Sequence, residues 1–245
     1  MTRVYGTELT QIYELVHEGR GKDYGAEAEE ITRRIRARLP GARTLLDVAC
    51  GTGAHLRAFA TRFEEVEGVE LSEAMCAVAR RRLPGVALHR ADMRDFRLGR
   101  TFHAVTCMFG SIGYARTPQE LTATLRCFAA HLAPGGVAAV DPWWFPETYL
   151  DGYVSGDTMT VDGRTVSRVS HSTREGTASV MRVHYLVADA ALGVRHFSES
   201  HRISLFSREQ YEEAFSRAGF AVEYVPRLHA GRGLFLGVRK SGRAG

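Results

Sequence analysis

The chain has 245 residues, of which 44% are hydrophobic and 24% charged, with a formal net charge of +4 and a pI of about 9.0. This length allows one large α/β domain, alone or with a smaller insertion, and the ordinary composition argues against long disordered stretches. We expect a cytoplasmic protein without signal peptide or membrane helix, because no apolar run approaches about 20 residues and the four scattered cysteines form no CxxC pair.

The first part of the chain is predicted to form two helices, followed by strands that alternate with helices. The two helices are expected over 7–18 and 23–39, with Asp23 as an N-cap. From residue 44 onward, strands are expected over 44–48, 66–70, 86–89, 103–107 and 136–141, and helices over 53–62, 72–82 and 118–132. Ser72 is an expected N-cap, Thr117 to Glu120 a capping box, and 132–136 a helix terminator. This alternation implies a parallel sheet covered on both faces.

Residues 152–205 show no helical period and are predicted to form an antiparallel insertion over the sheet. The signals are β-branched runs over 158–161, 180–187 and 196–205, with turns at Asp162–Gly163 and Glu175–Gly176. A helix over 207–218 and a closing antiparallel pair over 220–225 and 233–239 should follow. The expected fold is therefore α/β and Rossmann-like, with a mostly parallel seven-stranded sheet. We expect one domain from 1–142 and 206–245, and an insertion at 143–205 that covers the substrate site.

The stretch Leu45-Leu-Asp-Val-Ala-Cys-Gly-Thr-Gly53 connects a buried strand to a helix. Asp47 lies near the carboxyl end of that strand, where α/β folds place their ligands. Gly51 and Gly53 permit a sharp turn and a close approach of the backbone to a ligand, and the helix start offers free N–H groups. On its own, such a loop is also compatible with a plain tight turn.

Two acidic residues follow the next two strands. Glu70 ends the second strand, where a carboxylate can bind ribose hydroxyls. Asp92 follows the third strand and can accept a hydrogen bond from an adenine amino group. Ligands at the ends of three successive strands favour a nucleoside cofactor. Leu56 stands where a dinucleotide-binding G-x-G-x-x-G motif has its third glycine, which counts against a dehydrogenase.

These motifs resemble the class I methyltransferases that depend on S-adenosylmethionine. Further stretches are similar to the nucleotide-sugar N,N-dimethyltransferases of antibiotic pathways, which act on dTDP-amino-dideoxyhexoses; the most specific are Tyr13 to Tyr24, Pro142-Trp-Trp-Phe-Pro146 and Gly231-Arg-Gly-Leu-Phe235. The similarity extends from about Tyr5 to Val238. It implies S-adenosylmethionine as the cofactor and a dTDP-amino sugar as the substrate.

The resemblance also assigns residues. It places around the cofactor Tyr13, Tyr24, Asp47, Ala49, Gly51, Gly53, Glu70, Asp92, Met93 and Met108. Tyr5 and Trp144 match positions near the sugar, and Arg232 matches a basic residue that faces the nucleotide. Arg168 is assigned to the diphosphate because the insertion needs a cation there. Relatives usually have histidine at the position of Tyr114.

Methyl transfer to a neutral amine is an in-line displacement, which requires alignment more than a strong base. Tyr5 and Tyr114 are therefore the candidate catalytic residues: either could orient the amine or lead its proton to water, and packing is the alternative role for both. No metal is expected, because the spacing of the histidines suits structural roles; they include His55, His89, His103 and His131.

The expected function is methylation or dimethylation of the amino group of a dTDP-linked 3-amino-dideoxyhexose. The alternatives are a 4-amino sugar, a nucleic acid, and binding without catalysis. Residues 108–111 read Met-Phe-Gly-Ser, where base-methylating enzymes usually have an Asn/Asp-Pro-Pro-Tyr/Phe motif. We therefore expect neither a nucleic-acid partner nor a membrane partner. The oligomeric state is left open, with a homodimer as one option.

Overall fold

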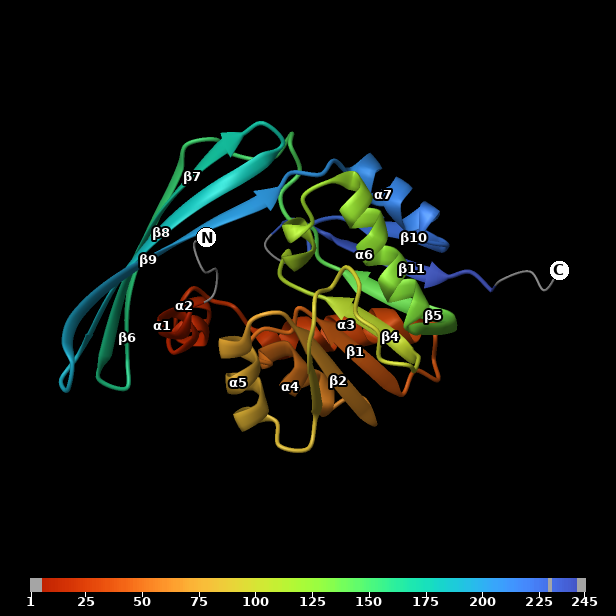
Figure 1. Cartoon of the computed structure of the whole chain (residues 1–245), viewed down its shortest axis with the longest axis horizontal. Helices are drawn as coiled ribbons and strands as arrows, with labels where there is room; N and C mark the ends of the chain where they lie inside the picture. The colour runs from red at the N-terminus through yellow and green to blue at the C-terminus, as the bar shows by residue number, and fades with distance from the viewer. Residues whose placement is uncertain (1–5, 229–230, 242–245) are drawn as a thin grey trace.

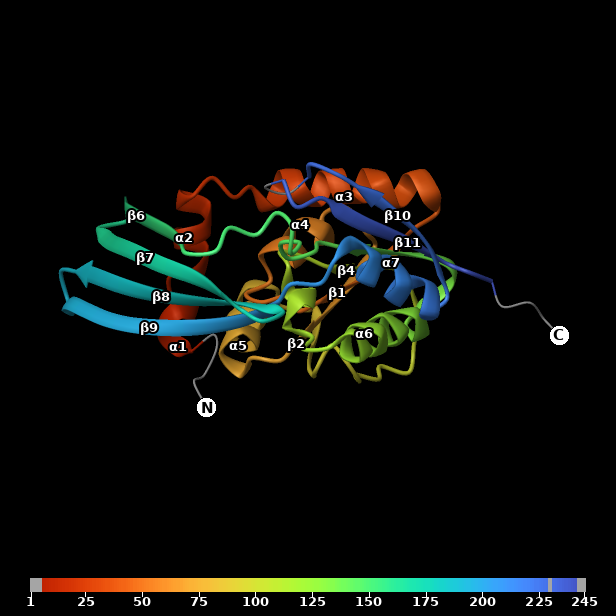
Figure 2. The same cartoon turned by 90° about the horizontal axis from the view of Figure 1, so that it is seen from above.

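The computed structural model describes residues 6–228 and 231–241 and contains two β-sheets (Figure 1). Seven strands form the large sheet in the order β10-β11-β5-β4-β1-β2-β3, and four form the small sheet in the order β6-β7-β8-β9. The small sheet stands to one side of the large sheet in both views (Figures 1 and 2). Among the described residues, no helix combines the length and apolar character needed to cross a membrane.

The large sheet is mostly parallel, as predicted. Its parallel strands are β1 (Thr44–Val48), β2 (Glu65–Glu70), β3 (Ala87–Arg90), β4 (Phe102–Cys107) and β5 (Leu132–Val140). The chain closes the sheet with an antiparallel pair, β10 (Phe220–Val225) and β11 (Leu234–Arg239), in which β11 also runs antiparallel to β5. The α/β, Rossmann-like prediction is thus confirmed.

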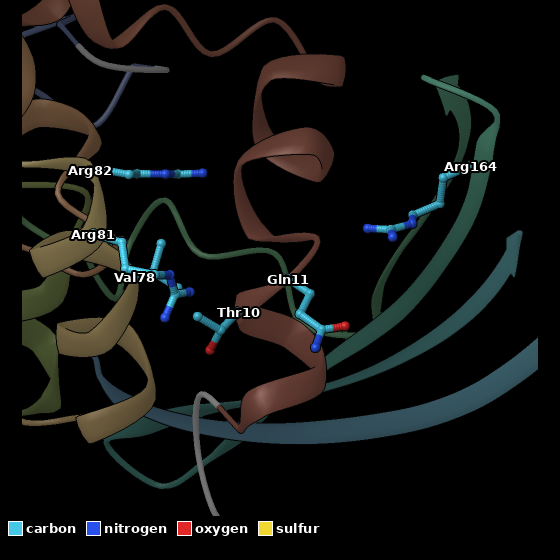
Figure 3. Close-up of a pocket in the computed structure, with 6 residues that line it drawn as sticks. All are labelled: Thr10, Gln11, Val78, Arg81, Arg82 and Arg164. Carbon is cyan, nitrogen blue, oxygen red and sulfur yellow. The ribbon is translucent and has the colours of Figure 1, made fainter. Parts of the chain in front are cut away.

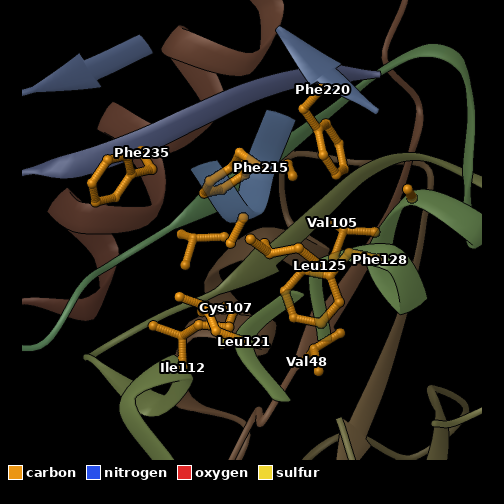
Figure 4. Close-up of a cluster of buried hydrophobic side chains, with 14 of the residues drawn as sticks. Val48, Val105, Cys107, Ile112, Leu121, Leu125, Phe128, Phe215, Phe220 and Phe235 are labelled. Carbon is orange, nitrogen blue, oxygen red and sulfur yellow. The ribbon is translucent and has the colours of Figure 1, made fainter. Parts of the chain in front are cut away.

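Helices cover both faces of the large sheet because successive residues of each central strand point to opposite sides. Leu46 and Val48 of β1 join the core formed with α6 (Pro118–Ala130) and α7 (Arg208–Arg217), shown in Figure 4. Leu45 belongs to the opposite core, with α3 (Tyr24–Arg38) and α4 (Ala54–Ala60). The remaining helix, α5 (Glu73–Arg82), contacts β2 and β3.

The small sheet is entirely antiparallel. Its strands are β6 (Tyr153–Val161), β7 (Arg164–Glu175), β8 (Ala178–Asp189) and β9 (Gly193–Ser204). One face, here called the inner face, is buried by α1 (Thr7–Thr10) and α2 (Tyr13–Gly19). The 3-10 helix η1 (Ser111–Tyr114), which follows β4, contacts β9. The small sheet thus lies beyond the carboxyl ends of the parallel strands, beside the large sheet rather than over it.

The sequence predictions fail where tertiary packing overrides local pattern. The single helix expected over 7–18 is wrong: a turn at Gln11 and Ile12 divides it in two, and Ile12 is buried with Leu9 against the inner face. The terminator expected at 132–136 is also wrong, because Leu132 already pairs with Phe102 and a register shift accommodates the left-handed Gly135. The strand β7 was not predicted at all.

Helix starts were predicted more accurately. Asp23 and Ser72 cap α3 and α5 through hydrogen bonds to backbone N–H groups. Thr117 accepts from the N–H of Glu120, but the expected capping box is only half formed because Glu120 instead accepts from Arg116 and Arg94. The division into domains at 142/143 and 205/206 stays a prediction.

Candidate active site

The glycine loop leaves β1 in a conformation that its small residues permit. Ala49, Gly51 and Gly53 all have positive φ angles, of 57°, 58° and 80°. A Cβ atom on Gly53 would lie 3.1 Å from Leu83 Cδ1 and 3.3 Å from Ala79 Cβ, so this glycine also lets α5 approach the loop. The left-handed Ala49 is a local strain of the kind that clusters at functional sites.

A small cavity of about 40 Å³ lies against this loop. Six of the predicted cofactor residues line it: Tyr13, Tyr24, Asp47, Ala49, Gly51 and Met108. The hydroxyl of Tyr24 is buried without a hydrogen-bond partner among the described residues. A buried donor of this kind is expected where a ligand supplies the acceptor, so the cavity fits the carboxylate end of an amino-acid-like ligand.

Buried carboxylates gather beside the cavity at the carboxyl ends of the parallel strands. Asp47 accepts a hydrogen bond of 2.7 Å from Thr106, and Asp141, directly after β5, accepts one of 2.9 Å from the Phe109 N–H. Burial raises the pKa of Asp47 to about 7, and repulsion from Glu70 and Asp141 adds to the rise. Such a cluster favours a cationic ligand. Asp141 was not predicted, although its place at the end of β5 was a usable signal.

Glu70 is hydrogen-bonded to the glycine loop and is not among the residues that line the cavity. Its carboxylate accepts hydrogen bonds from the N–H groups of Gly51 (2.9 Å) and Ser72 (2.7 Å), and burial raises its pKa. A carboxylate has about four acceptor sites, so these two bonds leave room for ribose hydroxyls. The loop and the start of α5 are thereby fixed to the same side chain.

Asp92 and Met93 continue along the edge of the sheet, outside the cavity wall. The N–H of Ala91 bonds to the carbonyl of Glu70 at 3.1 Å, which keeps this segment beside β2. The Asp92 carboxylate binds the Arg94 side chain at 2.6 and 2.9 Å, and these bonds lower its pKa. The cofactor residues therefore form two groups: one around the cavity, the other along the strand ends.

Two cations lie over the ring of Phe109, which also lines the cavity. The Lys22 ammonium is 4.0 Å from the ring centroid and the Arg232 guanidinium carbon is 5.5 Å from it. Arg232 is buried, also lies over Trp143 and Trp144, and its Nε has no hydrogen-bond partner among the described residues. Burial lowers its pKa. An arginine held in this way is suited to a planar anionic group.

Arg168 projects from the inner face of the small sheet. It is buried, donates to Ser170 at 3.0 Å, and forms no ion pair within the described part of the chain. Burial, with a contribution from Arg168, lowers the pKa of His17 to about 3. His17 is thus neutral, and its ring contacts Tyr13 and Phe109. His17 therefore lies near both Arg168 and the cavity.

Of the two candidate catalytic tyrosines, the structure describes Tyr114. Tyr114 ends η1 and its hydroxyl lies 2.8 Å from Nδ1 of His201 on β9. Tyr5 lies outside the described residues.

The four histidines expected to be structural all have partners within the fold. His55 pairs with Glu27, His89 with Glu67, His103 with Thr44, and His131 with the backbone at Leu98 and Cys127. No group of His, Cys, Asp and Glu in the described residues has the arrangement of a metal site.

A larger cleft of about 450 Å³ contains none of the predicted site residues. It is lined by Thr10, Gln11, Val78, Arg81, Arg82 and Arg164 (Figure 3). Its Arg82 pairs with Glu14, which in turn accepts a hydrogen bond from Thr52 of the glycine loop.

Comparisons with known proteins agree with this arrangement. A family model for a methyltransferase domain matches residues 45–136. The dTDP-3-amino-3,4,6-trideoxy-alpha-D-glucopyranose N,N-dimethyltransferase of Streptomyces venezuelae is 56% identical over 96% of this chain and 99% of that protein. The dTDP-4-amino-2,3,4,6-tetradeoxy-D-glucose N,N-dimethyltransferase of Saccharopolyspora spinosa is 47% identical, over 96% and 94%. The structure of SAM-bound CalS10, an amino pentose methyltransferase of Micromonospora echinaspora, is 51% identical with a TM-score of 0.87, covering 98% of this chain and 100% of that one.

Proposed function

The chain belongs to the S-adenosylmethionine-dependent dTDP-amino-sugar N,N-dimethyltransferases, and we propose that it dimethylates the 3-amino group of a dTDP-linked 3-amino-dideoxyhexose in antibiotic sugar biosynthesis. Support for the 3-position comes from the higher identity to the relative that acts on a 3-amino sugar, 56% against 47% for the 4-amino relative. The free thiols of its four cysteines are typical of the cytoplasm, where we place the reaction.

The observation that carries this proposal is the contact, at Phe109, between an acidic cavity and two buried cations. The cofactor is a cation at its sulfonium and amino groups, which suits the buried Asp47 and Asp141. The acceptor is an anion at its diphosphate, which suits Arg232 and Arg168. The two ligands would therefore meet with the methyl group between them.

Each predicted residue takes a role within this arrangement. In the proposal Tyr24 donates to the cofactor carboxylate, Glu70 binds the ribose, and Asp92 with the Met93 backbone binds the adenine. Gly51 and Gly53 let the loop backbone lie against the methionine part, with Tyr13, Ala49 and Met108 around it. Trp144 lies beside the sugar.

Catalysis then consists mainly of alignment, which can contribute roughly 7–11 kcal/mol. The cofactor supplies an activated methyl group when bound. Tyr114, and Tyr5 if it reaches the site, accept a hydrogen bond from the acceptor amine so that its lone pair faces that methyl group. The ammonium product must lose a proton to water before the second transfer.

Mass spectrometry of the chain incubated with cofactor and matched 3-amino and 4-amino dTDP sugars tests the proposal. We expect a gain of two methyl groups on the 3-amino sugar alone. Dimethylation of the 4-amino sugar alone would reassign the acceptor, and no methylation of either sugar would contradict the proposed substrate class.

A further inference from the structure

A line of buried polar side chains leads from the small sheet to Tyr114. The Tyr114 hydroxyl lies 2.8 Å from Nδ1 of His201, and Nε2 of His201 lies 3.5 Å from Glu199 Oε2. His201 and Glu199 are only 4% and 6% exposed. Because they are two residues apart on β9, they share the inner face of the sheet.

Apolar residues would be the ordinary choice at these positions. On the neighbouring strand β8, the inner face carries Val183 and Val187. A buried carboxylate and imidazole cost desolvation free energy unless they are paired, and perturbed ionisable groups gather at functional sites. Glu199 also accepts a hydrogen bond of 3.0 Å from the Gly6 N–H, so the pair holds the start of the described chain and at the same time stands beside Tyr114.

The order of the three groups decides the direction of the hydrogen bonds. A carboxylate beside Nε2 favours the tautomer with its proton on that nitrogen, which leaves Nδ1 as an acceptor. Burial, with repulsion from Arg168, lowers the pKa of His201 to about 4, so the ring is neutral near pH 7. Tyr114 then donates its hydroxyl proton to Nδ1, and the two lone pairs of its oxygen can accept hydrogen bonds.

Tyr114 also stands on the side of η1 that faces the cofactor cavity. Ser111 lines that cavity, and residues three apart in a 3-10 helix lie on the same side. His17, whose ring touches Phe109 of the cavity wall, lies near His201, which is among the groups that lower the pKa of His17. The pair on β9 thus approaches the site from the acceptor side.

We propose that His201 and Glu199 are positioning residues for methyl transfer. His201 keeps the hydroxyl proton of Tyr114 turned away from the acceptor, so that the Tyr114 oxygen accepts the N–H of the amine and directs its lone pair. Glu199 fixes the tautomer of His201. No proton is transferred in this step. The inference rests on the proposed function, in which Tyr114 meets the amine.

A double-mutant cycle tests whether His201 acts through Tyr114. Tyr114→Phe and His201→Leu should each lower kcat about 2- to 12-fold, the range for one neutral hydrogen bond. The double variant should be no slower than Tyr114→Phe. His201→Gln, whose amide oxygen can accept from Tyr114, should recover most of the rate. Monomethylated product should accumulate in His201→Leu, because the secondary amine has only one N–H to direct.

His196→Leu is the matched control, since His196 lies on the exposed outer face of the same strand and should leave kcat unchanged. If the loss of kcat in the double variant equalled the product of the losses in the two single variants, the proposal would be overturned. His201 would then have a structural role.

A second measurement requires neither substrate nor variant. NMR of the 15N-histidine-labelled wild-type enzyme should show the His201 proton on Nε2; a proton on Nδ1 would overturn the proposal. If the wild type methylates no amino sugar, the proposed function fails, and this spectrum still decides the hydrogen-bond arrangement.

Discussion

The cofactor side and the acceptor side of the proposed site differ in the charge of their side chains and in where those side chains stand in the fold. On the cofactor side, the carboxylates of Asp47, Glu70 and Asp141 lie at or near the carboxyl ends of parallel strands. On the acceptor side, the cations come from unrelated places: Lys22 before α3, Arg168 on β7 and Arg232 before β11. One side suits a cation and the other an anion. Under the proposed function, this difference in charge would direct the cofactor and the acceptor to different sides of the site.

The largest expected effect follows from removing a charge on the cofactor side. Glu70→Gln should weaken binding of S-adenosylmethionine about 100-fold, because hydrogen bonds to a charged group contribute about 1.5–3 kcal/mol each. Binding of dTDP should not change. Isothermal titration measures both affinities. The control is Glu65→Gln at the opposite, exposed end of the same strand, which pairs with Arg100. Weaker dTDP binding with intact cofactor binding would contradict the division of the two sides.

The mirror-image change is Arg232→Gln on the acceptor side. We expect the KM for the nucleotide sugar to rise about 30-fold. The rise should be smaller than for a site with a single cation, because Lys22 lies over the same Phe109 ring. Cofactor affinity should be unchanged. Arg208→Gln is the control, since Arg208 also lies over an aromatic ring, Tyr224, but is exposed at the start of α7. An equal rise in KM for the control would indicate a general charge effect.

The two sheets should also differ in tolerance to an added methyl group. In β2, a Cβ on Gly68 would lie 2.6 Å from Leu88 Cδ2 and 2.8 Å from Cys50 Sγ, whereas in β6 a Cβ on Gly156 would meet nothing closer than 3.8 Å. Gly68→Ala should therefore lower the free energy of unfolding by about 1–2 kcal/mol, and Gly156→Ala should leave it unchanged or raise it. Thermal unfolding measures the Tm of both variants. Equal Tm values would show that the neighbours of Gly68 in the large sheet shift to accommodate the added methyl group.

The smallest effect concerns pH. Asp47 has a pKa of about 7 in the folded protein against 3.8 for a free side chain, so between these values the native state holds a proton that the unfolded chain has lost. The free energy of unfolding therefore falls as pH rises from 4 to 7, and Asp47→Asn removes this slope. From pH 6 to pH 8 the wild type should lose about 2–4 °C in Tm relative to the variant, equivalent to about 1 kcal/mol. A Tm difference between the wild type and Asp47→Asn that stays constant across this pH range would show that Asp47 stays ionised.

The cofactor side could be predicted from sequence because its residues follow a local pattern. Asp47, Glu70 and Asp92 each come directly after or at the end of a strand, and parallel strand ends meet at one edge by topology. The same rule would have found Asp141 at the end of β5. Strand positions in the large sheet were predicted well because short strands alternate with helices along the chain, and several of those helices have clear start signals.

The acceptor side could not be predicted in this way. The pairing of Tyr114 with His201 joins residues 87 positions apart in the chain, and no local pattern fixes that contact. Arg168 and Arg232 were assigned from family resemblance and from the need for a cation, not from spacing. β7 was missed because its inner face carries Arg168, Ser170 and Ser172, which break the apolar alternation expected of a strand.

The most direct test of the two-sided site is a crystal structure with S-adenosylhomocysteine and dTDP bound together. We expect the amino-acid end of the first ligand beside Tyr24 and Asp47, and the diphosphate of the second between Arg168 and Arg232. A diphosphate bound instead in the cleft of Arg81, Arg82 and Arg164 would contradict this expectation.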